Sequence, residues 1–467
     1  MNLWDLKKYR NSLAVITEQG DRYYYHDLDR MQKKFASYIQ PQSLICIVAV
    51  NDLGSLIAYM ACLLNHSVPI LLSGDEREDS TGNILEKYQP DYVWLSIGLY
   101  KKYMSGLREY QRVFSYLGYE LITRKEKVIK NMNPDLALLL PTSGSTGSPR
   151  LVRISYTNIL ENTKSICQYM ELTAADRAVT SLPMSYTYGL SVINTLFYTG
   201  GSIFLTTKSV VNPVFWRHME EYGVTILSGV PYTYECMRKM NVPAKGLAKL
   251  RLMTQAGGKL SEELQKYWGE SALKKGAEFL IMYGQTEATA RISWLPYPDC
   301  LRKLGSAGIA LPGCEIMLED TEGRFIQKSY LEGEVVCRGR QVSMGYAEKL
   351  SDLGLGDLNH GILHTGDRGY FDEEGYLYIT GRMSRFAKIY GRRIDLVCVE
   401  KVAGEIWGED VIVLSDDRKV LLYMGSVPQE DDIVLLGYKT GLGKEVIEIC
   451  RREDIPRKSN GKVDYSK

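Results

Sequence analysis

The sequence predicts an α/β fold, in which helices cover sheets of mixed and parallel strands. Two observations carry this expectation. Short apolar runs alternate with stretches of helical periodicity from residue 12 onward, and most of the runs are uninterrupted, as in strands that are buried on both faces. At 467 residues, the chain also exceeds what one hydrophobic core usually organises, so we expect two to three domains or subdomains.

The individual elements follow from these runs in chain order. The expected strands are 13–16, 43–50, 68–72, 92–96, 136–140, 200–205, 224–231 and the apolar residues that begin at 252 and 279. The expected helices are 25–39, 56–64 and 158–170, and 179–190 predicts a strand that opens into a loop and then a helix. Ser261 is a suitable N-cap for a further helix. Segments 304–313, 333–346 and 364–382 alternate turn and strand residues, which indicates a β-rich subdomain.

The composition favours small-molecule partners. A formal net charge of +1 lacks the basic excess of a nucleic-acid or membrane-surface binder. The nine cysteines are scattered, odd in number and without a C-x-x-C pair, which is typical of reduced thiols in the cytoplasm. Residues 1–8 lack the pattern of a secretory signal, and the longest apolar run, near 57–64, is too short to span a bilayer that needs about 20 residues.

A phosphate-binding loop is predicted where the apolar run 138–141 ends. It combines glycines, whose backbone can turn N–H groups toward an anion, with hydroxyl donors and a cation. These residues are Thr142, Ser143, Gly144, Ser145, Thr146, Gly147 and Arg150. The glycine spacing and the missing lysine make the segment a poor match to the P-loop of NTPases. Composition alone would favour a flexible surface loop.

The string T-S-G-S-T-G-x-P-R resembles the phosphate loop of the acyl-adenylating enzymes, which include acyl-CoA synthetases, adenylation domains of peptide synthetases and luciferases. Two later segments resemble the same family in the same order. The resemblance implies that the loop with Gly257 and Gly258 lies against adenine, that Tyr283 stacks on it and that Thr286 contacts the α-phosphate. Glu287 would hold Mg²⁺, a hard cation that prefers carboxylate and phosphate oxygens.

Further roles are implied nearer the carboxyl terminus. By resemblance, Asp367 accepts hydrogen bonds from both ribose hydroxyls, and Arg382 is the cation beside the same sugar and phosphate. Residues 1–383 would form the adenylate-forming domain and 384–467 a small, mobile α+β domain that pivots at Ser384. Arg393 would lie near the α-phosphate. The string P-R-K-S-N-G-K at 456–462 resembles the family's closing motif, which implies that Lys462 is the catalytic lysine, although Lys-rich tails are usually only solvated charge.

The reaction implied by this resemblance is the ATP-dependent activation of a carboxylic acid to an acyl-AMP, followed by transfer to a thiol. The thiol would belong to coenzyme A or to the phosphopantetheine arm of a separate acyl carrier protein, and the face near 388–391 would serve this second step. The family places an acyl-binding wall at 179–190, where Tyr186 and Tyr188 could line the pocket or pack in the core.

Two alternatives remain open. The first is an amino-acid–carrier-protein ligase, which is disfavoured because Thr187 stands near the place of the Asp that would hold an ammonium group. The second is a non-catalytic nucleotide-binding scaffold, which the retained Glu287, Asp367 and Lys462 disfavour. His360 and His364 are four residues apart but lie among turn residues, so no transition metal is assigned to them.

Overall fold

The computed structural model describes residues 4–467 except 77, 101, 142–149, 243–247, 321, 383–385, 390–391, 417, 458–462 and 464–467. The chain divides into two compact units. The first contains residues 1–316 and 336–363, and the second contains 317–335 and 364–467. The chain crosses between the units within β17 (Cys314–Glu319), β18 (Gly333–Gly339) and β20 (Ile362–Phe371).

One sheet of the first unit has eight strands within the described residues. In spatial order they are β19 (Tyr346–Ala347), β9 (Leu151–Ser155), β8 (Leu136–Pro141), β4 (Val68–Ser73), β3 (Leu44–Ala49), β5 (Tyr92–Ser96), β7 (Tyr119–Arg124) and β6 (Tyr110–Tyr116). The central strands β8, β4, β3 and β5 run parallel, and β19, β9, β7 and β6 are antiparallel to their neighbours. Because β3 is buried throughout, its side chains alternate between two core clusters on opposite faces of the sheet.

The other large sheet has nine strands within the described part of the chain. In spatial order they are β16 (Ile309–Ala310), β15 (Ser293–Leu295), β14 (Glu278–Tyr283), β13 (Leu252–Gln255), β12 (Ile226–Gly229), β10 (Arg177–Val179), β11 (Ser202–Phe204), β1 (Leu13–Ile16) and β2 (Arg22–Tyr24). The strands from β14 to β1 in this order are parallel. The carboxyl ends of parallel strands share one edge of a sheet, so the loops that follow β13 and β14 emerge side by side.

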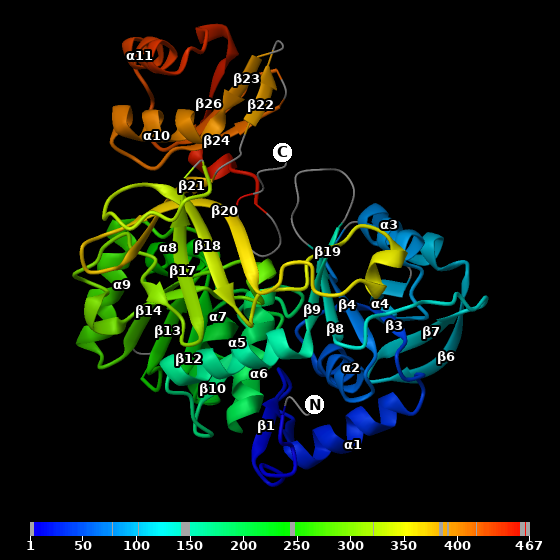
Figure 1. The fold of residues 1–467 in the computed structure, drawn as a ribbon. Helices are drawn as coiled ribbons and strands as arrows, with labels where there is room; N and C mark the ends of the chain where they lie inside the picture. Colours follow the sequence, from blue (N-terminus) through cyan, green and yellow to red (C-terminus); the bar gives the residue numbers. More distant parts are fainter. Residues whose placement is uncertain are drawn as a thin grey trace. The chain divides into compact units, whose positions relative to one another are not determined.

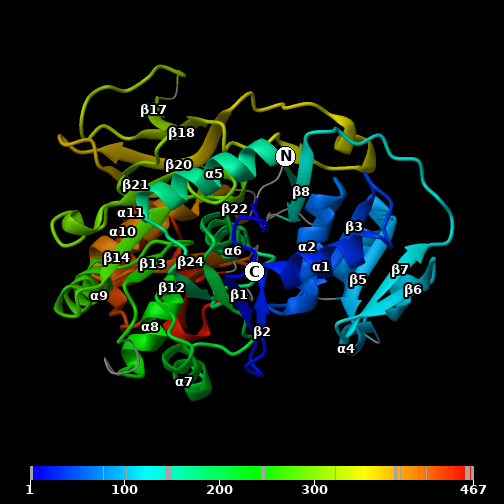
Figure 2. The ribbon, with the colours of Figure 1, turned by 90° about the horizontal axis from the view of Figure 1, so that it is seen from below.

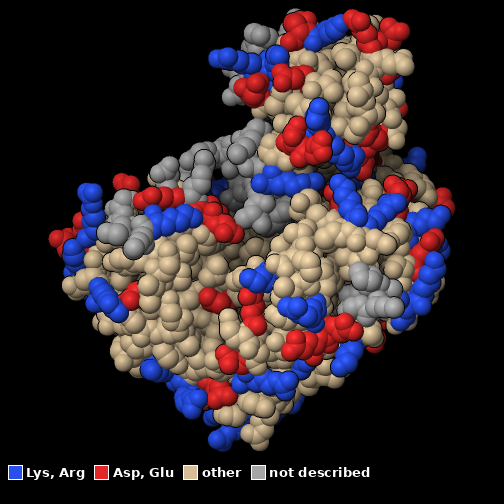
Figure 3. Space-filling view, turned by 180° about the vertical axis from the view of Figure 1, so that it is seen from behind, with Lys and Arg blue, Asp and Glu red and all other residues tan. Residues whose placement is uncertain are grey.

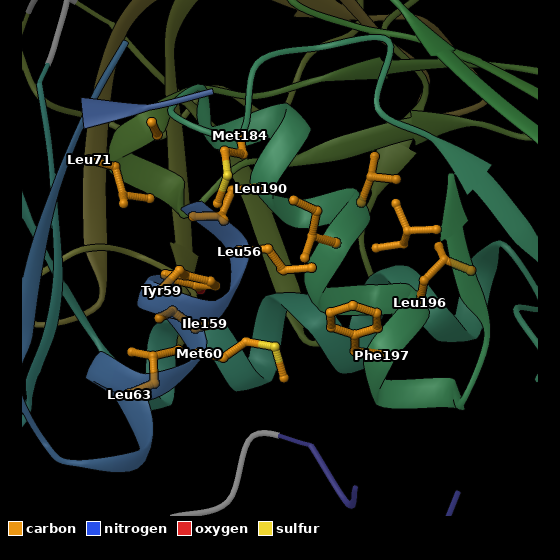
Figure 4. Packing of buried hydrophobic residues seen from close by; sticks show 14 of the residues in the cluster. Leu56, Tyr59, Met60, Leu63, Leu71, Ile159, Met184, Leu190, Leu196 and Phe197 are labelled. Carbon is orange, nitrogen blue, oxygen red and sulfur yellow. The ribbon is translucent and has the colours of Figure 1, made fainter. Parts of the chain in front are cut away.

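Helices bury most of the apolar surface of these sheets. They are α1 (Tyr25–Ala36), α2 (Leu53–Leu64), α3 (Glu78–Tyr88), α4 (Ile97–Tyr100), α5 (Tyr156–Tyr169), α6 (Thr187–Thr199), α7 (Pro213–Glu221), α8 (Pro231–Lys239) and α9 (Glu262–Lys274). Figures 1 and 2 show α1 and α2 beside β3 and β5. Leu56 and Tyr59 of α2, Ile159 of α5, and Leu190 and Phe197 of α6 belong to one packed cluster (Figure 4). This cluster places the start of α6 beside the large sheets.

The second unit is smaller and contains both strands and helices. Strand β21 (Leu377–Arg382) pairs with β20 and completes a four-stranded sheet of order β17-β18-β20-β21. The remaining elements are the hairpin of β22 (Phe386–Ile389) and β23 (Arg392–Asp395), then α10 (Leu396–Trp407), β24 (Ile412–Ser415), β25 (Val420–Met424), α11 (Glu430–Thr440) and β26 (Ile447–Arg451). Val399, Ala403, Val413, Leu422 and Leu436 form the centre of its core.

The predicted fold class is confirmed, and most element positions agree to within a few residues. Ser261 caps α9 as expected, because its Oγ accepts a hydrogen bond from the Leu264 N–H. Helix α1 ends at Ala36 rather than at residue 39, and β10 occupies 177–179, earlier than expected. The β6–β7 hairpin was not predicted, because β6 exposes most of its side chains and so forms no apolar run. The expected domain boundary at 384 lies outside the described residues and stays a prediction.

Charged side chains of both signs are interspersed over the face of the molecule shown in Figure 3. This distribution accords with the near-zero formal charge of the sequence. Large single-signed surfaces are the usual footprint of nucleic-acid recognition, and this face does not carry one among its described residues.

Candidate functional site

The loops after β13 and β14 bring three predicted adenine contacts to one edge of the nine-stranded sheet. The register pairs Gln255 with Ile281, so Gly257 and Gly258, which follow β13, come next to the end of the parallel strand β14, whose last residue is Tyr283. Gly257 has φ +86°, which a residue with a side chain rarely adopts. The amide of Gln255 donates a 2.9 Å hydrogen bond to the Gly258 carbonyl and fixes the loop. Two glycines without side chains, next to the strand end that carries an aromatic ring, suit a purine.

The loop from Tyr283 to Glu287 depends on the absence of a side chain at Gly284. A Cβ atom there would lie 2.1 Å from the carbonyl oxygen of Ala290 and 2.6 Å from the Cα of Arg291. Hydrogen bonds hold the far end of the loop: Ser343 N–H donates to the Glu287 carbonyl at 2.8 Å, and Thr289 Oγ1 donates to the Gln341 carbonyl at 2.7 Å. The motif is therefore rigid where Thr286 and Glu287 are presented.

Tyr346 links two of the predicted site residues. Its hydroxyl donates a 2.6 Å hydrogen bond to Oε1 of Glu287, and the guanidinium carbon of Arg150 lies 4.0 Å from the centre of its ring. Arg150 Nε is buried and has no hydrogen-bond partner among the described residues. Strand β19, which carries Tyr346, pairs with β9, which begins directly after Arg150. An oriented carboxylate beside a cation with spare donor capacity fits a magnesium–triphosphate group.

Sequence reasoning missed Tyr346. It stands at the end of 333–346, a segment that the sequence identified only as strands and turns of a β-rich subdomain. A single tyrosine in such a segment is no signal of its own, because only the β9–β19 pairing places it between Arg150 and Glu287.

The predicted acyl-binding wall adjoins the same loop. Thr187, the first residue of α6, donates a 2.9 Å hydrogen bond from Oγ1 to Oγ1 of Thr286. Thr187 also lines a narrow hollow that is partly open to solvent, the acyl hollow. Its polar lining consists of Asn162, Thr163, Thr187, Ser191, Asn194 and Thr289, and its other residues are leucines and isoleucines. Tyr188 is buried in the core rather than in this lining, and burial raises its pKa to about 12.

In the second unit, the two predicted ribose contacts are neighbours. Asp367 and Arg382 occupy opposite positions on β20 and β21, and Arg382 Nε donates to Asp367 Oδ1 at 2.8 Å. The Asp367 side chain is 6% exposed, whereas that of Arg382 is 60% exposed. The pairing gives the carboxylate a fixed orientation next to a solvent-accessible cation.

Several predicted site residues lie outside what the structure describes. Thr142, Ser143, Gly144, Ser145, Thr146 and Gly147 of the phosphate loop, the pivot Ser384 and the lysine Lys462 all fall in undescribed ranges. Arg393 lies on β23 opposite Lys388, and only its backbone is described. The roles assigned to these residues stay predictions.

Comparison with known proteins identifies the family. The family model described as "AMP-binding enzyme" matches residues 4–347, which is most of the chain. The chain belongs to the AMP-binding enzyme family. The matched range includes the phosphate loop, the Gly257–Gly258 loop, Tyr283 to Glu287, and Tyr346, so the predicted resemblance is confirmed.

Curated relatives of this AMP-binding enzyme are CoA ligases. The chain is similar to 2-succinylbenzoate–CoA ligase of Bacillus cereus strain ATCC 10987, with 28% identity over 336 residues that cover 70% of this chain and 68% of the relative. It is also similar to oxalate–CoA ligase of Arabidopsis thaliana, with 31% identity over 355 residues that cover 71% and 67% of the two chains. The predicted enzyme class, AMP-forming acid–thiol ligase, is thereby confirmed.

Solved structures confirm the fold of this AMP-binding enzyme. The structure of O-succinylbenzoate coenzyme A synthetase (MenE) from Bacillus subtilis in complex with AMP superimposes with a TM-score of 0.75 at 22% identity, covering 99% of this chain and 96% of that one. The same synthetase has also been solved with ATP and magnesium ion, with a TM-score of 0.73 at 21% identity, covering 99% and 98%.

Among the described residues, no helix combines the length and apolar character that crossing a membrane requires.

Proposed function

We propose that this enzyme uses ATP and Mg²⁺ to activate a small carboxylic acid and passes the acyl group to the thiol of coenzyme A. The observation that carries the proposal is the contact of Arg150 and Glu287 with opposite parts of Tyr346. It sets a cation and an oriented carboxylate beside the Thr286 hydroxyl, in a family whose members bind AMP. We favour coenzyme A over a carrier protein as the acceptor, and the names of the two curated relatives, both CoA ligases, support this choice.

The proposed reaction has two steps, adenylation of the acid and transfer of the acyl group to the thiol. An oxygen of the substrate carboxylate attacks the α-phosphorus of ATP, the bond to the bridging oxygen breaks, and pyrophosphate leaves with that electron pair. The thiol then attacks the acyl carbon, AMP leaves, and the thiol proton is released. Mg²⁺ held by Glu287 would supply positive charge that offsets the charge building on the phosphates.

Residues of the first unit would bind ATP and orient the groups that contact its phosphates. Tyr346 fixes the Glu287 carboxylate through its hydrogen bond, and Arg150 supplies a cation for the leaving pyrophosphate together with the loop 142–147. Thr286 would contact the α-phosphate, while Gly257, Gly258 and Tyr283 accept the adenine.

The second unit carries the remaining residues to which the prediction assigns roles. We assign Asp367 to the ribose hydroxyls, with Arg382 holding its carboxylate. Arg393 and Lys462 would meet the α-phosphate, in a domain of residues 384–467 that pivots at Ser384 and presents 388–391 for the thiol step. We also propose a cytoplasmic location, which the nine free cysteines support.

The amino-acid alternative receives no support from the acyl hollow. Its lining offers no carboxylate that could hold a substrate ammonium group, since Thr187 and its neighbours are neutral. A buried ammonium without a counter-charge would be costly, so α-amino acids are poor candidates.

Pyrophosphate release tests the proposal. Wild-type enzyme is assayed with ATP, Mg²⁺ and a panel of carboxylic acids, and hydroxylamine traps the acyl-AMP with and without coenzyme A. Glu287→Gln is expected to lower the adenylation rate about 100-fold or more. Glu278→Gln, an exposed carboxylate at the other end of β14, serves as the matched control and should retain the wild-type rate.

Three results would overturn parts of this function. Absence of acid-dependent pyrophosphate release across the panel would favour the nucleotide-binding scaffold. A Lys462→Ala variant that adenylates at the wild-type rate would remove the role assigned to that lysine. Equal transfer to coenzyme A and to free pantetheine would show that the nucleotide part of the acceptor is not recognised.

A further inference from the structure

Arg291 is a buried cation next to the acyl hollow. It follows the loop of Glu287, precedes β15 and is 1% exposed. Its Nη1 donates to the Tyr169 hydroxyl at 2.8 Å, and its Nη2 donates to Ser191 Oγ at 3.2 Å. Its Nε is buried and has no hydrogen-bond partner among the described residues, and no carboxylate of the described chain forms an ion pair with it. This arrangement leaves its positive charge uncompensated.

The groups around Arg291 cannot supply a negative charge near neutral pH. Burial raises the pKa of Tyr169 and raises the pKa of Tyr188 to about 12, although the charge of Arg291 opposes both shifts. Burial likewise raises the pKa of Cys167 to about 12. The guanidinium carbon lies 4.9 Å from the centre of the Tyr188 ring, a cation–π contact that is weaker than an ion pair.

Arg153 is a buried arginine whose guanidinium nitrogens all donate hydrogen bonds to backbone carbonyls. It is also fully buried, but its guanidinium donates to the carbonyl oxygens of Met344, Tyr346, Leu355 and Gly356. Every nitrogen of that group has a strong acceptor. Arg291 instead contacts two hydroxyls, the thioether sulfur of Met170 and a ring. Buried cations are normally paired, so a structural role alone explains Arg153 better than Arg291.

Ser191 connects Arg291 to the hollow. This serine lines the hollow, and its Oγ accepts the hydrogen bond from Arg291 Nη2. Asn162, another lining residue, donates from its side-chain amide to the Arg291 carbonyl at 3.1 Å. The lining itself is uncharged, so little screens the field of the guanidinium there. The hollow therefore favours an anionic group and disfavours an ammonium group.

We propose that Arg291 is a specificity-determining residue and that the preferred substrates are small dicarboxylic acids. One carboxylate is activated near Thr286, which is hydrogen-bonded to the lining residue Thr187, and the second is stabilised near Ser191 by the charge of Arg291. This inference rests on the proposed function for the activated carboxylate. It adds the chemical class of the acid and the residue that selects it.

The test compares dicarboxylic acids with their half-amides, which keep the size and remove one charge. Oxalate, malonate, succinate, glutarate and phthalate are each paired with the half-amide, and kcat/KM for pyrophosphate release is measured for both. Wild-type enzyme should prefer the best diacid over its half-amide about tenfold or more. Arg291→Met should bring this ratio close to one, and Arg291→Lys should restore most of it because the charge returns.

Arg153→Lys is the matched control. It weakens hydrogen bonds of a buried arginine whose guanidinium donates to carbonyl oxygens of residues outside the hollow lining, so Tm should fall while the diacid preference stays at the wild-type ratio. Should Arg291→Met fail to fold, Arg291→Lys and Ser191→Ala supply the comparison, with Ser191→Ala reducing the preference several-fold.

A binding measurement separates this inference from the proposed function. Calorimetric titration of wild type and variants with each diacid and half-amide needs no turnover. Tighter binding of the diacid that is lost in Arg291→Met supports the inference even if no acid is adenylated. Turnover of half-amides at the diacid rate, or an unchanged preference in Arg291→Met, would overturn it while leaving acid–thiol ligation intact.

Discussion

Tyr346 donates a 2.6 Å hydrogen bond to Glu287, and the face of its ring carries the guanidinium of Arg150. The two contacts use different parts of one side chain, so they can be removed separately. Tyr346→Phe keeps the ring and its contact with Arg150 but leaves the Glu287 carboxylate without this donor. Because hydrogen bonds to charged groups contribute about 1.5 to 3 kcal/mol, we expect kcat/KM for Mg–ATP to fall about 10- to 100-fold.

Tyr88→Phe is the control for this substitution. The Tyr88 hydroxyl donates to the carbonyl of Ala347, next to Tyr346 in the chain. Loss of the Tyr88 hydroxyl should lower Tm and leave KM for Mg–ATP unchanged. Tyr346→Phe should instead lower kcat/KM for Mg–ATP and leave Tm close to the wild-type value. A wild-type KM and kcat in Tyr346→Phe would show that Glu287 does not depend on this hydrogen bond.

Gly284→Ala should disrupt the loop that presents Thr286 and Glu287. The added Cβ would lie 2.1 Å from the Ala290 carbonyl oxygen, so the backbone must move. We expect loss of most adenylation activity and a decrease in the free energy of unfolding of about 1 to 3 kcal/mol, measured by urea titration. Gly82→Ala is the control: nothing lies within 4 Å of the added Cβ in α3, so it should be neutral or stabilising by about 0.5 to 1 kcal/mol.

Periodicity and motif order predicted much of this fold and little of its site geometry. Strand β5 at Tyr92–Ser96 coincides with its expected range, because a short, uninterrupted apolar run is typical of a buried strand. Glu287 and Arg150 were identified because their motifs are local in sequence. Tyr346 and Arg291 were not identified, since each acquires its contacts from segments far along the chain. The hydrogen bond from Tyr346 spans 59 positions, and that from Arg291 to Ser191 spans 100.

Lowering the pH should reduce the folding stability of the first unit, because Asp176 becomes protonated. Burial would raise the pKa of this carboxylate, but hydrogen bonds from Arg251 and from the Thr173 N–H outweigh burial and hold it below its usual value. A carboxyl with a depressed folded-state pKa stabilises the fold above its unfolded pKa of about 3.9, and that stabilisation is lost as pH falls through the folded value. Asp176→Asn should therefore cost about 2 kcal/mol at pH 7 and progressively less below about pH 4.

Urea titrations of wild type and Asp176→Asn at pH 7, 5, 4 and 3 measure this difference. The control is Asp29→Asn, which removes a surface pair with Lys33 and should change stability by about 0.5 kcal/mol or less. A constant difference between wild type and Asp176→Asn across the pH range would contradict the ionic role of Asp176.

The thiols of Cys314 and Cys337 form a coupled pair on the neighbouring strands β17 and β18. Their sulfur atoms lie 3.3 Å apart, and Gln341 donates to the Cys337 sulfur at 3.4 Å. The hydrogen bond from Cys337 lowers the pKa of Cys314 below its ordinary value of 9.0, against the effect of burial, whereas the same contact and burial raise the pKa of Cys337. The Cys314 thiolate should therefore form at a lower pH than in an isolated thiol.

Cys337→Ala should move the pKa of Cys314 upward, because it removes the donor that stabilises the thiolate. The measurement is the pH midpoint of iodoacetamide alkylation at Cys314, followed by mass spectrometry of its peptide. The midpoint is used rather than the rate, since the smaller side chain at 337 also changes access to Cys314. Cys46→Ala, a buried thiol outside this pair, should leave the midpoint unchanged. A midpoint that stays constant or falls in Cys337→Ala would show that the neighbouring thiol does not stabilise the Cys314 thiolate.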